Sequence, residues 1–542
     1  MRLGVEQFGG HVEPSGHAIV SASGSNCHDA NKLGALQVVD SGEVFNLAET
    51  REDPMPKDQL GRIEHIVVLM LENRSFDHML GFLYSDTDNR SPAGAPFEGL
   101  TGTEANSDAT GKSVSVFRID PSGPAPYFAP GANPGEGYSA TNLQLFGADP
   151  APVPAIAGNG GFVTNFAATL ALDAARHRPI QPGTTPADIM GMFTPELLPV
   201  LSGLARGYAV CDHWFCSVPT ETIPNRAFVA AGTSQGHMND STKSFTVPTI
   251  FGLLSTASVT WKIYGYDSEP LTRLDFPDTT AAPDSHFGLF PDFQHDAAED
   301  RLPGYAFLEP SWGSSGNSQH PPYDVAKGEQ LIHDVYRALR DGPGWNQTLL
   351  IVTYDEHGGC YDHVPPPTGA IPPDGTTGEY GFDFTRFGVR VPTVVVSPLI
   401  APGTVFRVPS DSTPLDHTSI LKTVEARWGL RALTARDAAA PDIADVLTLS
   451  TPRADDPLDG VVVPTSAAPN PAAGVPSHLQ EVQAELVSQL PLPPEQRVRT
   501  PALSTLETPA DYDEYIRSRI ETWRAQAKGR PRPTASAPGR GG

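Results

Sequence analysis

Cysteine is scarce in this chain of 542 residues, which contains only Cys27, Cys211, Cys216 and Cys360. Four cysteines in a chain of this length exclude a small scaffold held together by disulfides. Cys211 and Cys216 are close enough in sequence to form one bridge, whereas buried reduced thiols are the simpler alternative.

Long hydrophobic runs are also absent, because no apolar stretch approaches the ~18 residues that a membrane-spanning helix requires. The first residues, MRLGVEQFGGHVEPSG, lack the charged and apolar regions of a secretory signal and contain no twin-arginine pair. We therefore expect a soluble protein, either cytoplasmic or secreted by a route that the sequence does not reveal.

Positive charge is in short supply: 37 Lys and Arg residues face 63 Asp and Glu residues, which gives a net charge of −26. Such a surface repels nucleic acid and anionic lipid, so we expect no nucleic-acid partner and at most transient contact with a membrane surface. Small or zwitterionic substrates remain compatible with this charge, and no feature indicates an obligate protein partner.

Continuous apolar segments predict the buried strands of a parallel sheet. They lie at 65–71, 348–354 and 390–399, and residues 324–342 between them have the apolar period of a helix. Apolar strands that alternate with helices are typical of an α/β fold, here a three-layer sandwich around a mostly parallel sheet. The 55 Pro and 51 Gly predict long loops or caps, chiefly at 84–160 and 266–302.

Composition shifts divide the chain into four parts. Toward the C-terminus, Pro, Ala and Thr dominate, and two short amphipathic helices are expected, with the apolar faces Leu479, Val482, Leu486, Leu490 and Tyr512, Ile516, Ile520, Trp523. The parts are an N-terminal extension (1–60), a main domain (61–450), a Pro/Ala-rich region with the two helices (451–528) and a disordered tail (529–542).

Two of the apolar strands end in pairs of oxygen-bearing side chains. Glu72 and Asn73 follow the first strand, and Asp355 and Glu356 follow the second. The carboxyl ends of parallel strands form the ligand-binding edge of such a sheet. Carboxylates brought together there repel one another unless a cation lies between them, so the two pairs together predict a divalent metal site. Either pair alone is compatible with helix capping or surface salt bridges.

A hydroxyl nucleophile could act beside such a metal. Thr222 is followed by Ile-Pro-Asn-Arg, and Pro224 restricts the backbone next to it. A metal can lower the pKa of a hydroxyl and orient it for attack. From the local sequence alone, an ordinary threonine in a turn explains the pattern equally well.

The segment GTSQG (232–236) offers a rival nucleophile, because it fits the G-x-S-x-G elbow of serine hydrolases with Ser234 at its centre. That motif requires a strand, a sharp turn and then a helix. The polar sequence HMNDSTKS that follows is a poor helix former, so we interpret GTSQG as a chance match.

The sequence resembles the phosphoesterase family, which includes the non-specific, phosphatidylcholine-type phospholipases C and related acid phosphatases. The resemblance spans about residues 60–430. The motifs that carry it, in the same order, are ENRSFDHMLGFL (72–83), DIMGMFTPELLPVLSGLARGYAVCDHWFCSVPTETIPNR (188–226), FLEP (307–310), QHPPYDV (319–325), TYDEHGGCYDHVPPP (353–367), GVRVPTVVVSPLI (388–400) and DHTSILKTVEARWG (416–429). The family belongs to the alkaline phosphatase superfamily, so the resemblance implies that fold.

The resemblance also implies roles for individual residues. Thr222 would be the nucleophile and a metal ligand, His320 would bind the phosphoryl group or protonate the leaving alcohol, and His363 and His78 occupy motif positions that are either catalytic or structural. Arg74 and Arg226 would be internal salt-bridge partners. The implied metal ligands are Glu72, Asn73, Thr222, Asp355 and Glu356, and the implied substrate-binding residues are Asn73, His320 and Glu136.

Glu136 marks a departure from the family pattern. Many members carry a histidine of a D-P-x-H motif ahead of the nucleophile segment, whereas this chain has ANPGEGYS (132–139) with Glu136 at the expected position. A carboxylate repels a dianionic phosphate, and it could instead favour a cationic headgroup such as choline.

These observations predict a metal-dependent phosphoesterase, specifically a phospholipase C that forms a phosphothreonine intermediate at Thr222. The oxygen ligands suit Ca²⁺, Mg²⁺ or Mn²⁺, and Fe or Zn is compatible. The alternatives are a soluble phosphatase or phosphodiesterase with the same site, an acyl-ester hydrolase that uses Ser234, and a non-catalytic metal-binding protein.

Overall fold

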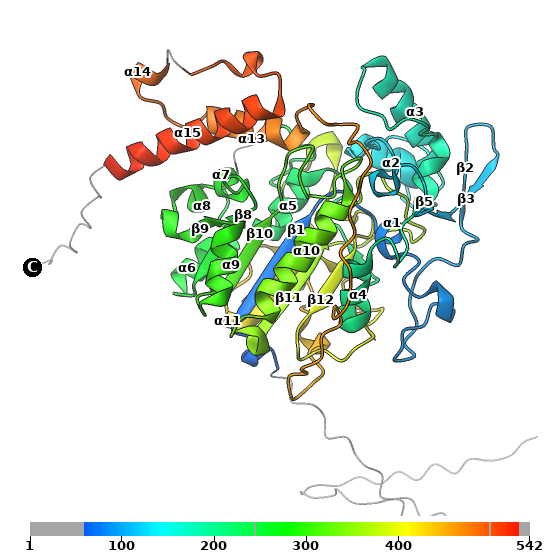
Figure 1. Cartoon of the computed structure of the whole chain (residues 1–542), viewed down its shortest axis with the longest axis horizontal. Coiled ribbons are helices and arrows are strands. Elements are labelled where there is room, and N and C mark those ends of the chain that lie inside the picture. Colours follow the sequence, from blue (N-terminus) through cyan, green and yellow to red (C-terminus); the bar gives the residue numbers. More distant parts are fainter. Residues whose placement is uncertain (1–58, 243–244, 498–499, 530–542) are drawn as a thin grey trace, which may run out of the picture. The chain divides into compact units, whose positions relative to one another are not determined.

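The computed structural model describes residues 59–242, 245–497 and 500–529 (Figure 1). The expected extension (1–60), apart from its last two residues, and the expected tail (529–542), apart from its first residue, lie outside the described residues, as does Cys27.

An eight-stranded sheet forms the centre of the described chain, with the strand order β13-β6-β12-β11-β1-β10-β8-β9. All neighbouring strands are parallel except β12, which is antiparallel to both β11 and β6. In this order the strands are Thr404–Val405, Ala209–Val210, Thr393–Val396, Thr348–Tyr354, His65–Leu71, Tyr305–Glu309, Trp261–Gly265 and Phe287–Leu289.

The two long apolar strands predicted from sequence are confirmed with the same bounds, as β1 and β11. Every residue of β11 is buried, and only the first residue of β1 is partly exposed, as expected for central strands with both faces covered. The third predicted strand, 390–399, is shorter than expected, because the part of it that joins the central sheet is Thr393–Val396 (β12), while Arg390 forms an isolated bridge with Phe215.

The segment 266–302, expected as a long loop or a small cap, is largely structured and lies at the sheet edge. It contains the edge strand β9 and helix α9 (Phe290–Ala298). Strand β9 has only three residues, which is too short for a period of alternation to be recognised.

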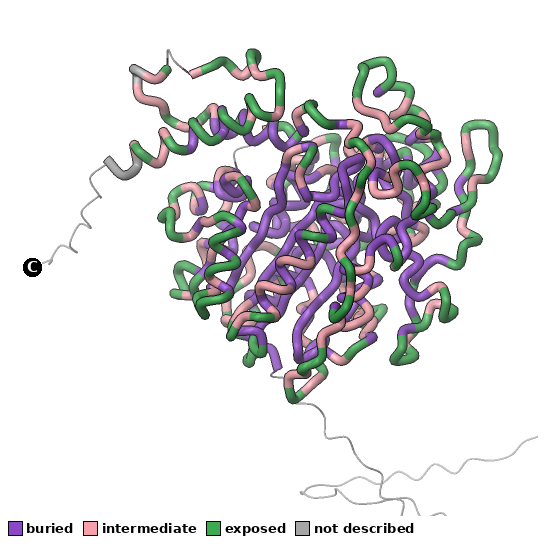
Figure 2. Tube along the Cα trace, viewed as in Figure 1, coloured by how far each residue is buried: buried purple, intermediate pink, exposed green. Residues whose placement is uncertain are grey.

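Two groups of helices cover the sheet, giving the expected three-layer α/β sandwich. Helix α10 (Val325–Arg340) contacts α4 (Pro199–Gly207) and α9, and crosses in front of the sheet in Figure 1. Helix α5 (Thr222–Ala231) contacts α11 (Thr418–Trp428) and α6 (Ile250–Thr256). Buried residues concentrate along the sheet and on the helix faces that contact it (Figure 2).

Helix α10 shows how the sequence specifies these elements. Asp324 caps its N-terminus by accepting a hydrogen bond from the backbone N–H of Ala326. The apolar positions at helical spacing, including Leu331, Val335 and Leu339, are all buried. The predicted helix at 324–342 is therefore confirmed.

Shorter helices and strands surround the central sandwich. The remaining helices of the main domain are α1 (Phe76–Leu80), α2 (Tyr138–Phe146), α3 (Phe162–Ala175), α7 (Thr272–Asp275), α8 (Pro277–Ala281) and α12 (Ala435–Ala439). The minor strands are β2 (Ala105–Ser107), β3 (Ser113–Ser115), β4 (Phe117–Arg118), β5 (Gly191–Met192), β7 (Trp214–Phe215) and β14 (Leu415–Asp416).

The C-terminal region forms the two expected helices, α13 (His478–Ser488) and α15 (Pro509–Gly529), with the short α14 (Pro494–Arg497) between them. Leu479, Val482 and Leu486 of α13 belong to the principal hydrophobic core. Across the described ranges, no helix is both long and apolar enough to span a bilayer. The apolar face of α13 is therefore used for packing.

The three cysteines in the described part of the chain, Cys211, Cys216 and Cys360, are buried and free. Of the two alternatives raised by the sequence, the structure contains the reduced thiols and no bridge between Cys211 and Cys216.

Candidate active site

The two oxygen-bearing pairs meet at one edge of the sheet. Strands β1 and β11 are parallel neighbours, and their register pairs Leu71 with Tyr354. The next residues of both strands therefore lie side by side, and the backbone N–H of Asn73 donates a hydrogen bond to Asp355 Oδ1 over 3.0 Å. Asn73 adopts a left-handed backbone conformation (φ 57°), which is uncommon outside glycine and is found at functional sites.

The carboxylates at this edge are buried and poorly compensated. The pKa of Glu72 is raised to about 8, chiefly by burial and to a smaller extent by the charge of Asp355. The pKa of Glu356 is raised well above its usual range, chiefly by burial and to a smaller extent by the charges of Glu136 and Asp355. Asp355 has an arginine in contact, since Arg226 Nε lies 2.9 Å from its Oδ2. His357 Nδ1 lies 3.2 Å from Glu356 Oε2, but burial lowers the pKa of His357 to about 3 and so disfavours its charged form.

One carboxylate oxygen of Glu72 and one of Glu356, Oε1 in each case, is buried without a hydrogen-bond partner. An unpartnered buried acceptor is costly unless something satisfies it. Together with the side-chain oxygens of Asn73 and Asp355, these atoms are of the type that divalent cations bind in proteins. Among the described residues, the ligand atoms found within 4.8 Å of one another are those of Asp77, Asp362 and His363. The fit of Glu72, Asn73, Asp355 and Glu356 to a metal ion therefore rests on their donor chemistry and on the two unpartnered oxygens.

Thr222 is the first residue of helix α5, and its Oγ1 donates a hydrogen bond to Asn73 Oδ1 over 3.2 Å. The partial positive charge of a helix N-terminus stabilises a hydroxyl oxygen that becomes negative. Thr220 is arranged differently, because it is fully buried and its Oγ1 donates to the carbonyl of Met238 over 2.8 Å. Of the two threonines, only Thr222 has its side chain at the carboxylate edge.

Asn225 fixes the turn that precedes Thr222. Its Nδ2 donates to the carbonyls of Val218, Thr220 and Glu221, and its Oδ1 accepts from the N–H of Val218. The asparagine of the Thr-Ile-Pro-Asn-Arg sequence thus holds the turn before Thr222, and Arg226 pairs with Asp355 as the family resemblance implied.

Glu136 and His320 also reach this edge. Glu136 Oε2 accepts a hydrogen bond from Asn73 Nδ2 over 2.8 Å and lies 3.6 Å from His320 Nε2. Burial raises the pKa of Glu136 and lowers that of His320 to about 4. His320 Nδ1 donates to the carbonyl of Pro321 over 2.6 Å, so the neutral ring presents the lone pair of Nε2.

His363 lies in a different network. Its Nδ1 is 2.6 Å from Asp77 Oδ2, and Arg390 holds both Asp77 (2.8 Å) and Asp362 (2.9 Å). Burial lowers the pKa of His363, but the hydrogen bond to Asp77 together with the charges of Asp77 and Asp362 outweighs burial, and the net shift is upward. Ligand atoms of Asp77, Asp362 and His363 lie within 4.8 Å of one another, a spacing that suits a metal, yet Arg390 already supplies a cation to both carboxylates.

The other motif residues have structural contacts. His78 is buried and its ring packs against Phe193. Arg74 donates to the carbonyls of Gln319 and Ala129. The expectation that Arg74 is a salt-bridge partner is therefore wrong, because backbone carbonyls take the place of a carboxylate.

The rival elbow lacks its required geometry. Ser234 follows helix α5 through Gly232, where the motif requires a strand before the serine. The described residues from 233 to 242 form bends and turns, and Ser234 Oγ is buried without a hydrogen-bond partner. A serine in this setting is not activated by a neighbouring base.

A small cavity opens at the carboxylate edge. Its lining includes predicted residues and others that no sequence motif indicated as site residues: Glu72, Thr222, Asp240, Trp312, His320, Tyr323, Ser477, His478 and Leu479. Asp240 and His478 stand outside the recognised motifs and far apart along the chain, so no local signal identified them.

Two further buried histidines do lie in motifs: His417 donates to the carbonyl of Asp355 over 2.6 Å, and His357 contacts Gln144 over 2.8 Å.

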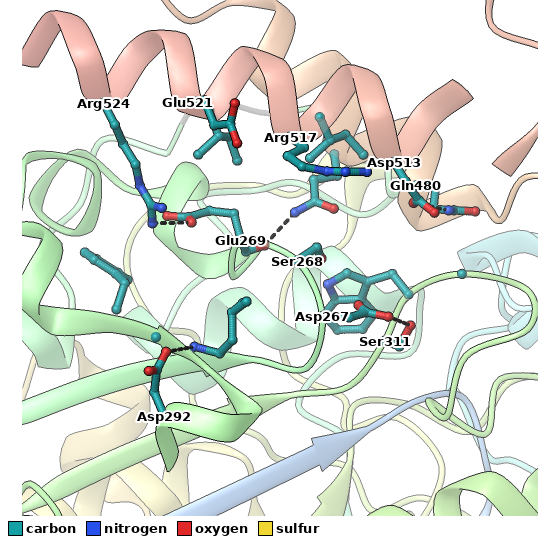
Figure 3. Close-up of a pocket in the computed structure, with 18 of the residues that line it drawn as sticks. Asp267, Ser268, Glu269, Asp292, Ser311, Gln480, Asp513, Arg517, Glu521 and Arg524 are labelled. Atoms are coloured by element: carbon teal, nitrogen blue, oxygen red, sulfur yellow. Dashed lines mark hydrogen bonds and ion pairs between the residues drawn. The ribbon is translucent and has the colours of Figure 1, made fainter. Parts of the chain in front are cut away.

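A larger cavity of about 780 Å³ lies between α15 and the segment after β8 (Figure 3). Figure 3 shows Arg517, Glu521 and Arg524 of α15 above Asp267 and Glu269, and Arg524 lies 2.5 Å from Glu269. Trp312 lines both cavities. The charged lining differs from the apolar walls that are typical of lipid-chain sites.

Comparison with known proteins agrees with the motifs. The model of the Phosphoesterase family matches residues 63–431. The chain is 37% identical to "Non-specific phospholipase C6" of Arabidopsis thaliana over 78% of this chain and 79% of that protein. It is 30% identical to "Phospholipase C A" of Mycobacterium tuberculosis over 72% of this chain and 78% of that protein.

Among solved structures, a protein of the alkaline phosphatase superfamily from Vibrio parahaemolyticus is similar at a TM-score of 0.28. It is 13% identical, and the match covers 46% of this chain and 64% of that one.

Proposed function

Because the chain belongs to the phosphoesterase family, we propose that it is a metal-dependent phospholipase C. In this proposal it cleaves a glycerophospholipid to diacylglycerol and a phosphorylated headgroup. The observation that carries the proposal is the position of the Thr222 hydroxyl. It stands at a helix N-terminus, is hydrogen-bonded to Asn73 and faces the cavity that Glu72 also lines.

Glu72, Asn73, Asp355, Glu356 and Thr222 would hold one divalent ion. The two unpartnered carboxylate oxygens and the raised pKa values of Glu72 and Glu356 support this assignment, since each is what burial of anionic groups without a nearby cation produces. When bound, such an ion neutralises charge on the phosphoryl oxygens and lowers the pKa of a hydroxyl.

Thr222 acts as the nucleophile. Its Oγ forms a bond to phosphorus while the bond from phosphorus to the glycerol oxygen breaks, and diacylglycerol leaves. His320 lines the same cavity and presents the lone pair of Nε2, so it accepts the proton that Thr222 loses and returns it to the leaving alcohol. Water then attacks phosphorus and gives a proton to His320, the bond from phosphorus to the Thr222 oxygen breaks, that oxygen takes the proton back from His320, and the phosphorylated headgroup is released.

Glu136 sets a preference among phosphoesters. Its Oε2 is held by Asn73 at the carboxylate edge, where it repels a phosphomonoester dianion more than a phosphodiester monoanion. A diester with a cationic headgroup is therefore the favoured substrate, and a soluble monoester is the disfavoured one.

A product assay tests the proposal. Purified protein of known metal content is incubated with phosphatidylcholine, and diacylglycerol, phosphocholine and free fatty acid are each quantified. A parallel assay uses p-nitrophenyl phosphate as a soluble monoester. We expect diacylglycerol and phosphocholine in equal amounts; release of fatty acid, or turnover of the monoester alone, would refute the phospholipase C assignment.

A further inference from the structure

Helix α13 begins at the reaction cavity. Its N-cap residue Ser477 and its first two residues, His478 and Leu479, line the same small cavity as Glu72 and Thr222. More than 200 positions of sequence separate Thr222 from His478. The C-terminal region therefore supplies part of the wall of a site whose other residues come from the main domain.

A buried carboxylate links His478 to the nucleophile helix. His478 Nε2 lies 3.6 Å from Asp240 Oδ2, and Asp240 Oδ1 accepts a hydrogen bond from the backbone N–H of Ile223 over 2.7 Å. Ile223 directly follows Thr222. The backbone N–H of Asp240 also donates to Glu221 Oε2 over 2.6 Å, so both the backbone and the carboxylate of Asp240 are held in place.

Two helix N-termini face this cavity. Thr222 is the first residue of α5, and His478 is the first residue of α13, whose cap Ser477 accepts from the N–H of Gln480. Both termini carry partial positive charge. The cavity volume is about 10 Å³, room for roughly one oxygen-sized group, so an atom inside it touches the walls that both helices supply.

His478 has a property that the other lining histidine lacks. His320 is kept neutral by burial and its Nδ1–H is used by the carbonyl of Pro321. The side chain of His478 is 51% exposed, so part of its ring is accessible to solvent and to a ligand while its Nε2 lies 3.6 Å from Asp240 Oδ2. The carboxylates of Glu72, Glu136 and Asp240 near this cavity repel an anionic ligand. Binding such a ligand there requires a hydrogen-bond donor, and His478 at the N-terminus of α13 supplies an N–H.

We propose that His478 binds a phosphoryl oxygen of the substrate, so that the C-terminal helix α13 completes the substrate site. This inference rests on the proposed phosphoester hydrolysis, because it assigns one wall of that same site. In this proposal His478 contacts the substrate and replaces the family histidine whose position Glu136 occupies in this chain. Asp240 then orients the ring of His478.

The test compares three variants of the full-length protein with their metal content measured. His478→Ala removes the donor, His478→Gln keeps an uncharged donor of similar reach, and His295→Ala is the control, since His295 is exposed on α9 and lines neither cavity. The readouts are kcat/KM for a phosphodiester, the inhibition constant of inorganic phosphate, and the melting temperature. The exposure of His478 makes a folding defect a minor concern, and the melting temperature verifies this.

We expect His478→Ala to lower kcat/KM and to weaken phosphate inhibition, each by at least about tenfold, the usual effect of losing a hydrogen bond to a charged group. His478→Gln should stay within about threefold of the parent on the same scale, and His295→Ala should match the parent. Unchanged phosphate inhibition in His478→Ala overturns the proposal. Equal defects in His478→Ala and His478→Gln also overturn it, because they assign the effect to the ion pair with Asp240.

Titration calorimetry with inorganic phosphate separates this inference from the proposed function. One outcome is that the parent protein binds phosphate but hydrolyses no phosphoester, and that His478→Ala loses the binding. This result would support the anion site and refute the proposed reaction. If the parent hydrolyses the diester and His478→Ala binds phosphate as tightly as the parent, the proposed reaction is supported and the proposed role of His478 is refuted.

Discussion

The Thr222 hydroxyl donates a hydrogen bond to Asn73 Oδ1 over 3.2 Å, which joins the first turn of α5 to the residue pair that follows β1. Asn73 in turn donates its backbone N–H to Asp355 Oδ1. These two hydrogen bonds connect a hydroxyl, an amide and a carboxylate from three separate segments.

Thr222→Ala should lower turnover of a phosphodiester by at least about 10³-fold, because loss of a nucleophile costs more than loss of a positioning contact. Metal content should fall only modestly, since the four other proposed ligands remain. Thr220→Ala is the matched control; its hydroxyl bonds to the carbonyl of Met238, so it should alter stability more than turnover. Steady-state kinetics of both variants decide the matter, and the reverse ranking would place the nucleophile at Thr220.

Removal of the metal should destabilise the protein. Without a cation, the buried carboxylates of Glu72 and Glu356 face Asp355 with one oxygen of each unpartnered. A ligand bound only to the folded state raises its melting temperature, so a chelator should lower it by several degrees and addition of the metal should restore it. Scanning calorimetry with and without chelator measures the shift. In Glu356→Gln the shift should shrink together with metal content; an undiminished shift would locate the metal elsewhere.

Ser234→Ala should retain activity within about twofold and should keep or slightly raise stability, because it removes a buried hydroxyl that has no partner. Turnover of the phosphodiester and the melting temperature are the measurements. Loss of turnover in a folded variant with normal metal content would revive the acyl-ester hydrolase.

His363→Asn should affect stability more than turnover, because His363 contacts Asp77 rather than Thr222. The pKa of His363 is raised in the folded state, so its contribution to stability is complete below its ordinary pKa of about 6.5 and is lost as the pH rises through the higher folded value. The melting temperatures of parent and variant should therefore differ most near pH 6 and converge at alkaline pH. A difference that grows with pH would contradict this assignment.

Glu136→Gln should shift the substrate preference toward phosphomonoesters. The change removes a negative charge next to His320 and Asn73 while an amide oxygen can still accept from Asn73 Nδ2. We expect the monoester-to-diester ratio of kcat/KM to rise at least about threefold, the scale of a partly screened like-charge repulsion. Paired assays with p-nitrophenyl phosphate and a phosphodiester measure the ratio; an unchanged ratio would show that Glu136 does not select substrate charge.

Local sequence was sufficient for the elements that have a strong period. The bounds of β1 and β11 followed from seven-residue apolar runs, and α10 followed from apolar residues at helical spacing. The edge strand β9 has three residues and is stabilised by pairing with β8, so its own sequence contains no period to recognise.

The amino-acid sequence by itself determined which residues stand at the ends of β1 and β11, since a parallel sheet brings the carboxyl ends of its strands to one edge. Only the tertiary structure decided which other side chains join them. It placed Thr222 rather than Thr220 beside Asn73, and it moved His363 into the Asp77–Arg390 network. It also brought His478 from the C-terminal region to the cavity. Such contacts depend on how distant segments pack, and packing is decided by burial and complementarity over the whole chain rather than by any local pattern.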